Sequence, residues 1–160
     1  MRRKIYAAYG SNLNVAQMSY RCPEATRLHT AVLEGYELVF RGNRYHAVAT
    51  IEPKEGSSVP IMLWSIGKKD EKALDHYEGY PSFYGKETMT FDVGGQKVKA
   101  MVYVMTPGHQ LGTPSVGYYS TIRQGYKDCG LDVAVLDRAV QHSLELVGHE
   151  PPSLGELRMW

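Results

Sequence analysis

The sequence predicts an α+β fold, with about six mainly antiparallel strands and several helices packed beside them. Stretches rich in β-branched and aromatic residues alternate with turn residues over much of the chain, and the apolar spacing changes to a helical period at several places. With 160 residues, 43% of them apolar, the chain is long enough for one domain with a sizeable core. We expect residues 1–150 to form this domain and residues 151–160 to be a C-terminal tail.

The strands follow from apolar runs that end at turn residues. A first, buried strand is predicted over Arg3–Tyr9, and Gly94-Gly95 predicts a two-residue hairpin turn. Residues 52–58, which include Pro53 and Gly56, are interpreted as a loop. The other predicted strands are Thr30–Arg41, Tyr45–Ile51, Val59–Ile66, Tyr84–Val93 and Gln96–Met105.

The helices are predicted from spacing and from residues that begin or end them. Asn14 is the expected N-cap of a short helix that Pro23 stops. A helix over Lys68–Tyr77 has Asp70 as its predicted N-cap and Gly79 as the left-handed residue at its end. Two more helices are predicted, one opened by Pro114-Ser115 and reaching about Lys127, the other over Asp132–Val147.

Charge and cysteine content restrict the possible partners. The 18 basic and 17 acidic residues leave a formal charge of +1, so no global field attracts nucleic acid or an anionic membrane. The basic and aromatic cluster at residues 41–46 is better explained as a hairpin end in solvent than as a nucleic-acid patch. No apolar run approaches membrane-spanning length. Cys22 and Cys129 are too few and too distant for a disulfide framework, which favours a cytoplasmic protein.

The turn after the first strand is a candidate binding site. Gly10 permits either a positive φ or the close approach of another group, while Ser11 and Asn12 add side-chain donors and acceptors. The helix that follows is expected to point its N-terminal amides at this turn and to favour an anion there. Taken alone, an ordinary strand-to-helix turn is the simpler interpretation, so other residues must converge here to make a site.

Glu78 is a candidate proton acceptor. It lies at the end of a predicted helix, where the helix dipole and burial would both raise the pKa of its carboxyl. The aromatic residues Tyr80, Phe83 and Tyr84 follow closely and would shield it from water. The alternative is an ordinary surface glutamate at a helix end, which is the commoner situation.

Three motifs in this order resemble a known family. Tyr9-Gly10-Ser11-Asn12-Leu13, Leu74-Asp75-x-x-Glu78-Gly79-Tyr80 and Pro114-Ser115-x-x-Tyr118 resemble the γ-glutamylcyclotransferase-like superfamily, in particular its bacterial γ-glutamylcyclotransferase or AIG2-like group. Shorter matches around Met18–Pro23 and Leu33–Tyr36 lie between them, and the resemblance spans about Ile5 to Leu131. It implies a small β-barrel-like sheet with flanking helices, no metal and no organic cofactor.

The resemblance also implies an activity. In the family, the α-amine of a γ-glutamyl unit attacks its own side-chain carbonyl, which releases 5-oxoproline and a free amine or amino acid. The residue matching Glu78 is the catalytic acid/base. The residues matching the turn hold the γ-glutamyl group, and two tyrosines line the pocket. The implied binding residues here are Tyr9, Gly10, Ser11, Asn12, Leu13, Tyr84 and Tyr118.

Several alternatives stay open. A Cys-His hydrolase using Cys22 or Cys129 has no recognisable nucleophile context, and the six histidines show no metal-ligand spacing. A non-catalytic binding module for a γ-glutamyl-like molecule would keep the pocket but would not need Glu78. Arg41 and Arg44 either meet a carboxylate of a γ-glutamyl amino acid or lie in water. The identity of the γ-glutamyl compound is open, and the chain is expected to be a monomer or a homodimer.

Overall fold

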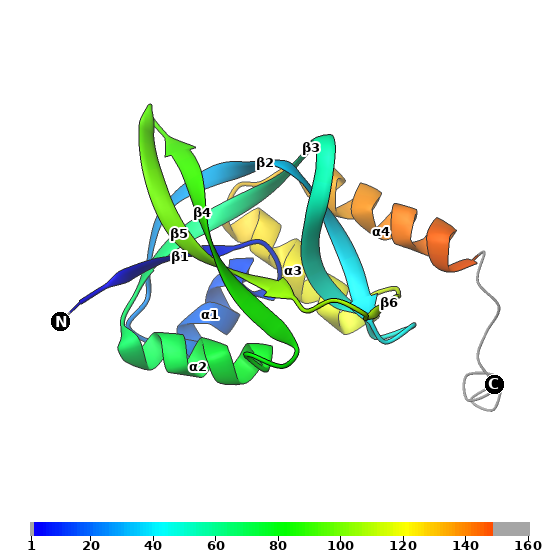
Figure 1. The fold of residues 1–160 in the computed structure, drawn as a ribbon, viewed down its shortest axis with the longest axis horizontal. Helices are drawn as coiled ribbons and strands as arrows, with labels where there is room; N and C mark the ends of the chain where they lie inside the picture. Colours follow the sequence, from blue (N-terminus) through cyan, green and yellow to red (C-terminus); the bar gives the residue numbers. More distant parts are fainter. Residues whose placement is uncertain (1, 149–160) are drawn as a thin grey trace.

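A computed structural model describes residues 2–148 and shows a curled sheet with helices packed below it and at one side (Figure 1). The tail predicted over residues 151–160 lies outside the described residues. Six strands form one sheet in the order β4-β5-β1-β3-β2-β6. Their bounds are β1 Lys4–Ala8, β2 Thr26–Gly42, β3 Val48–Ile66, β4 Tyr84–Val93, β5 Gln96–Met105 and β6 Gln110–Leu111.

Strand β1 lies inside the sheet between β3 and β5. It is antiparallel to β3 and parallel to β5, where Tyr6 is opposite Met101, and the other paired strands are antiparallel. The sheet curls so far that the end of β5 also contacts the beginning of β3, where the Met105 amide donates to Thr50 Oγ1 at 3.0 Å. The predicted mixed, mainly antiparallel and barrel-like sheet is therefore confirmed as a six-stranded half-barrel.

The middle of the chain forms two long strands where three shorter ones were predicted. The expected loop at residues 52–58 is wrong, because these residues belong to β3 and stay next to β2 through a wide bulge. Between the pairs Tyr36–Pro53 and Glu34–Ser58, Gly35 alone faces four residues of β3. β2 also begins earlier than predicted, at Thr26, and the short strand β6 was not foreseen.

β3 begins at Val48, later than the predicted Tyr45, because a side chain holds the preceding residues in a turn. Asn43 Oδ1 accepts the amides of Tyr45 at 3.0 Å and His46 at 3.1 Å. An asparagine bonded in this way to its own neighbouring backbone competes with strand pairing.

The predicted helices are present, with one error in capping. Asn14 caps α1 by accepting the Gln17 amide at 2.9 Å, and Gly79 ends α2 at φ +66°. Asp70 is not the N-cap of α2. Gly67 holds that position, and the Asp70 carboxylate accepts its amide at 3.0 Å. The helices are the short 3-10 helix η1 Ser11–Leu13, then α1 Val15–Arg21, α2 Lys68–Glu78, α3 Val116–Asp128 and α4 Val133–Gly148.

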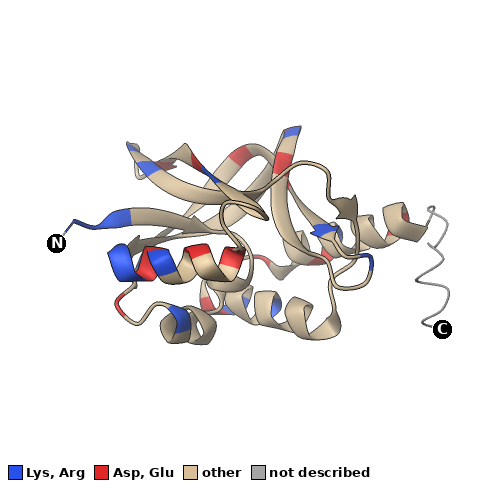
Figure 2. Cartoon of the chain, turned by 60° about the horizontal axis from the view of Figure 1, so that its bottom comes forward, with Lys and Arg blue, Asp and Glu red and all other residues tan. Residues whose placement is uncertain are grey.

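Ion pairs hold α2 against the sheet. Glu71 pairs with Lys4 of β1 at 3.0 Å and with Lys86 of β4 at 2.8 Å, and Lys86 also reaches Asp75 at 2.8 Å. Figure 2 shows both acidic and basic residues along this helix, so the helix does not present a surface of one charge. Leu74, on the same helix, is completely buried in the core. These contacts hold α2 beside β1 and β4.

Helix α3 packs closely against the turn that follows β1. A Cβ atom at Gly125 would lie 2.5 Å from the Asn14 backbone nitrogen, so only glycine permits this approach. Asp128, at the end of α3, accepts the Val15 amide at 3.0 Å. The turn is therefore braced from behind by a helix more than a hundred residues away in sequence. None of the helices in residues 2–148 is long and apolar enough to cross a membrane.

Candidate active site

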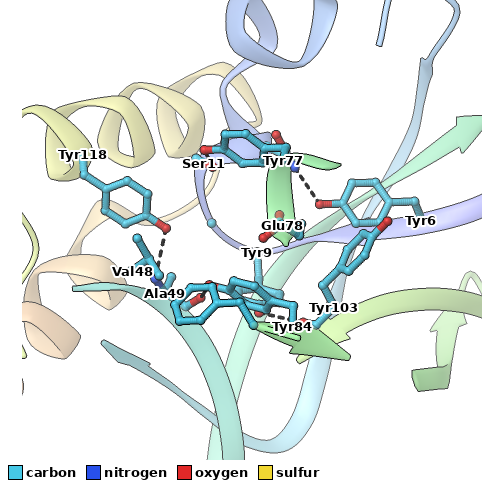
Figure 3. A pocket seen from close by; sticks show the side chains of 13 residues that line it. Tyr6, Tyr9, Ser11, Val48, Ala49, Tyr77, Glu78, Tyr84, Tyr103 and Tyr118 are labelled. Atoms are coloured by element: carbon cyan, nitrogen blue, oxygen red, sulfur yellow. Dashed lines mark hydrogen bonds between the residues drawn. The ribbon is translucent and has the colours of Figure 1, made fainter. Parts of the chain in front are cut away.

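A cavity of about 240 Å³ opens where β1, the turn after it, the end of α2 and helix α3 meet (Figure 3). Glu78 and the predicted binding residues line it, except Leu13. Leu13 is completely buried and is absent from the cavity wall. The lining residues are Tyr6, Tyr9, Gly10, Ser11, Asn12, Val48, Ala49, Tyr77, Glu78, Phe83, Tyr84, Tyr103 and Tyr118.

The turn supplies spare backbone donors. Its 3-10 helix uses the amides of Leu13 and Asn14, which donate to the carbonyls of Gly10 and Ser11 at 3.0 and 3.1 Å. Within residues 2–148, the amides of Gly10, Ser11 and Asn12 donate no hydrogen bond to the protein. Successive free amides of this kind suit an anion or a developing oxyanion.

The expectation that the next helix points its N-terminal amides at this turn is wrong. The Val15 amide is used by Asp128, and the Gln17 amide is used by Asn14. Both acceptors lie outside the cavity wall. The anion-binding capacity of this wall therefore comes from the turn itself.

Gly10 allows the close approach of other groups. Its φ of −122° is not in the left-handed region, so this position does not need glycine for a positive φ. The other predicted reason, the close approach of another group, applies here. A Cβ atom at this position would lie 3.4 Å from the Ala49 Cβ and 3.6 Å from the Tyr118 hydroxyl. A side chain here would therefore occupy cavity space.

Glu78 is the last residue of α2 and points into the cavity (Figure 3). Burial raises the pKa of its carboxyl to about 7, and the Arg21 charge opposes part of that rise. In the described part of the chain, the carboxylate makes no hydrogen bond or ion pair. The predicted rise in pKa thus agrees with the structure, with burial among aromatic rings as the main cause. The exposed-glutamate alternative does not apply.

Two hydroxyls in the wall keep a proton to donate. A tyrosine hydroxyl has one proton and can also accept. Tyr118 accepts the Ala49 amide at 3.0 Å, and Tyr6 accepts from Asn12 Nδ2 at 2.9 Å. Since both bonds use the oxygen as acceptor, the protons of Tyr6 and Tyr118 are available to a ligand.

Three other hydroxyls have their protons committed. Tyr84 donates to the Ala49 carbonyl at 2.5 Å, and Tyr9 donates to the Tyr103 carbonyl at 2.7 Å. The Tyr103 hydroxyl donates to Asp75 Oδ1 at 2.6 Å. Toward a ligand these oxygens can only accept. The cavity therefore combines fixed donors with fixed acceptors around one carboxyl group.

Sequence reasoning missed Tyr6, Tyr77 and Tyr103, which line the cavity beside the predicted residues. Tyr6 and Tyr103 lie on neighbouring parallel strands, with ring centroids 5.8 Å apart. Nothing in the local sequence distinguishes them from other strand tyrosines, because their role depends on which strands become neighbours. Tyr77 directly precedes Glu78, and the sequence predicts it only as the last residue of a helix.

The arginines considered for a substrate carboxylate lie elsewhere. Arg41 pairs with Glu52 and donates to the His109 carbonyl at 2.9 Å. Arg44 is buried and donates to the Val147 carbonyl at 3.2 Å. Neither belongs to the cavity wall.

The cysteines do not fit a nucleophile. Burial raises the pKa of the Cys22 thiol to about 12, and its Sγ lies 3.6 Å from the Asp70 carbonyl, outside the cavity wall. Burial also raises the pKa of Cys129. Among residues 2–148 there is no group of three or more histidine, cysteine or acidic side chains placed to hold a metal ion.

Comparison with known proteins finds similarity to one family. The family model described as "Gamma-glutamyl cyclotransferase, AIG2-like" matches residues 6–121. Gamma-glutamylcyclotransferase from Mus musculus is 31% identical over 137 residues, which cover 79% of this chain and 72% of the mouse protein. The Homo sapiens enzyme of the same name is 29% identical over 136 residues, with the same coverage.

Solved structures show the same fold. One described as gamma-glutamyl cyclotransferase superposes with a TM-score of 0.76 at 25% identity, covering 96% of this chain and 90% of its own. A Homo sapiens protein described as uncharacterized superposes with a TM-score of 0.75 at 26% identity, covering 96% of this chain and 91% of its own. The similarity therefore extends over nearly the whole length of this chain and of each solved structure.

Proposed function

Because this chain belongs to the AIG2-like γ-glutamylcyclotransferase family and is an enzyme of that family, we propose that it converts a γ-glutamyl amide into 5-oxoproline and a free amine or amino acid. The observation that carries the proposal is the position of Glu78. Its carboxyl, with a pKa raised to about 7, shares one small cavity with the free amides of the Gly10–Asn12 turn. A proton acceptor and an oxyanion site are the two groups that an internal aminolysis requires.

Glu78 would transfer the proton that the reaction moves. The substrate's α-ammonium must lose a proton before its nitrogen can attack, because an amine beside a carboxylate is protonated at neutral pH. A carboxylate whose pKa is raised toward neutrality is a better proton acceptor than an ordinary glutamate. The nitrogen then bonds to the side-chain carbonyl carbon, the amide C–N bond breaks, and Glu78 returns the proton to the leaving nitrogen.

The fixed hydroxyls support one orientation of the substrate. Tyr103 has only acceptor capacity left and would receive the ammonium together with Glu78. Tyr118 and Tyr6 keep protons, as do the turn amides, and these donors would bind the α-carboxylate and the oxyanion. Since attacking and attacked atoms belong to one molecule, holding the chain bent is a large part of the catalysis.

The cavity supports a small γ-glutamyl compound as the ligand. Its volume of about 240 Å³ is suited to a glutamyl unit, with the leaving amine toward the opening. Both cysteines are free, which is consistent with the reducing cytoplasm as the compartment.

Purified protein incubated with γ-glutamyl amino acids, γ-glutamyl amines and glutathione tests the proposal by release of 5-oxoproline. We expect at least one compound to react, and Glu78→Gln to lower turnover at least a hundredfold with an unchanged circular dichroism spectrum. Glu55→Gln, at an exposed glutamate of β3, is the matched control and should retain activity. No 5-oxoproline from any compound, or near-normal turnover by Glu78→Gln, would refute the proposal.

A further inference from the structure

Arg21 lies just outside the cavity wall and has no part in the proposed reaction. It lies in the last turn of α1 and is not among the lining residues. Its guanidinium donates to Asn12 Oδ1 and, at 3.2 Å, to Gln17 Oε1. The same group lies flat enough over Tyr77 for its Cζ to be 3.4 Å from the ring centroid. One side chain therefore contacts both the turn and the end of α2.

The contact with Asn12 determines which way that amide points. Arginine can only donate, so the Asn12 end that faces it must be the oxygen. The Nδ2 end then faces Tyr6 and donates to its hydroxyl at 2.9 Å. This leaves the Tyr6 proton free for the cavity. If Asn12 turned over, the Tyr6 hydroxyl would have to donate to the amide oxygen, and one cavity donor would be lost.

The contact with Tyr77 acts on the other wall. Arginine stacks on aromatic faces through cation–π attraction. The Tyr77 hydroxyl lies 2.9 Å from Ser11 Oγ, and its neighbour in sequence is Glu78. Stacking by Arg21 therefore holds the end of α2 at a fixed distance from the turn.

We propose that Arg21 is a positioning residue for the cyclotransferase reaction, which orients Asn12 and Tyr6 on one wall and Tyr77 beside Glu78 on the other without touching the substrate. The proposal deepens the function proposed above and rests on it. Both contacts use the planar guanidinium, one through a hydrogen bond and one through its face. Lysine offers neither the fork nor the flat face, so it can replace the charge but not the geometry.

The charge of Arg21 also acts on Glu78. It lowers the pKa of that carboxyl against the larger effect of burial. The other titratable groups that interact with Glu78 are hydroxyls whose own pKa values burial raises, so they are uncharged at neutral pH. These are Tyr6 and Tyr9 at β1, Tyr84 of β4, Tyr103 of β5 and Tyr118 of α3. On α2 itself, Asp75 is occupied by Lys86 and Tyr103.

The kinetic test compares two substitutions at this position. We expect Arg21→Met to lower kcat/KM at least tenfold and to move the acid limb of its pH profile upward by about half a pH unit or more, because the pKa of Glu78 rises without the nearby cation. Arg21→Lys should keep the acid limb near its wild-type position while kcat/KM stays several-fold low. Gln17→Ala removes only the outer contact of Arg21 and is the control, expected within twofold of wild type.

A double-mutant cycle separates positioning from simple loss of stability. If Arg21 works through Asn12 on Tyr6, then Tyr6→Phe should cost much less in the Arg21→Met or Arg21→Lys background than in the wild type. An unchanged kcat/KM in Arg21→Met overturns the proposal. The proposal is also overturned if Arg21→Met lowers kcat/KM but its effect adds independently to that of Tyr6→Phe and the acid limb of the pH profile does not move. Should Arg21→Met fail to fold, Arg21→Lys and its cycle carry the same test.

A measurement without substrate distinguishes this proposal from the proposed function. Carbon-13 NMR of glutamate-labelled protein reports the titration of the Glu78 carboxyl, with Glu78→Gln identifying the signal. We expect a higher midpoint in Arg21→Met and a midpoint near the wild type in Arg21→Lys. If these shifts occur but the wild type releases no 5-oxoproline, the proposed reaction fails while the coupling of Arg21 to Glu78 stands. An unmoved midpoint in Arg21→Met contradicts that coupling.

Discussion

Replacing Gly125 by alanine should destabilise the protein, although alanine is the better helix former. Gly125 lies inside α3, and a Cβ atom there would be 2.5 Å from the Asn14 nitrogen and 2.6 Å from the Leu13 carbonyl carbon. These are backbone atoms of the turn that carries the cavity donors. They cannot swing aside as a flexible side chain would, because Asn14 caps α1 and Asp128 holds the Val15 amide.

The size of the effect follows from two opposing contributions. Alanine in a helix interior gains about 1 kcal/mol over glycine. Forcing an extra methyl group into a packed site costs about 1–3 kcal/mol and sometimes more, and contacts this short lie at the upper end of that range. We expect a net loss of about 1–3 kcal/mol, which lowers Tm by roughly 3–10 °C in a domain of this size.

Gly117→Ala is the matched control, because it adds the same methyl group to the same helix where no heavy atom lies within 4 Å. It should leave stability unchanged or raise it by up to about 1 kcal/mol. Thermal and urea unfolding followed by circular dichroism measures both variants. Gly125→Ala should also raise KM, since the displaced turn carries Gly10 to Asn12. If Gly125→Ala proves as stable as Gly117→Ala, the close packing of α3 on the turn is refuted.

Two further predictions concern the cavity itself. The folded protein holds the pKa of Glu78 at about 7, against about 4.3 in the unfolded chain. Ionisation therefore costs stability: wild type and Glu78→Gln should differ least near pH 4, and wild type should lose up to about 3 kcal/mol relative to the variant as pH rises through 7. Urea unfolding at pH 4.5 and 8 measures this, and a pH-independent difference contradicts it. Gly10→Ala should change stability by less than about 1 kcal/mol, since its Cβ contacts are of ordinary length, yet raise KM roughly tenfold by occupying cavity space; an unchanged KM in substrate titration contradicts this.

Local chemistry was sufficient wherever one side chain or one glycine determines the backbone. Gly94 and Gly95 both adopt positive φ, at +58° and +85°, and the strands on either side have the predicted bounds. Asn14 caps the helix that it was predicted to cap, and Ser115, from the pair predicted to open α3, caps that helix. In each case the deciding contact joins residues no more than three positions apart, so it can be predicted from the local sequence.

Distant pairing overrode local signals elsewhere. Pro53 and Gly56 are typical of a loop, yet the segment between them is held next to β2, because the long strands continue to pair on both sides of it. The capping of α2 shows the same limit on a smaller scale. Asp70 is an excellent N-cap residue, but in the structure it reaches back three positions to the amide of Gly67.

The position of the cavity follows from the parallel pairing of β1 with β5. Parallel strands bring their carboxyl ends to the same edge of a sheet, so the turn that leaves β1 meets the end of β5, and the Tyr9 hydroxyl reaches the Tyr103 carbonyl at 2.7 Å. An antiparallel neighbour would place its other end there and remove Tyr103 from the wall. The motif around Gly10 can be read from the sequence, but the acceptor opposite it cannot, because strand order depends on contacts over the whole chain. The ion pairs of Lys86 then bring α2, and with it Glu78, to that same edge.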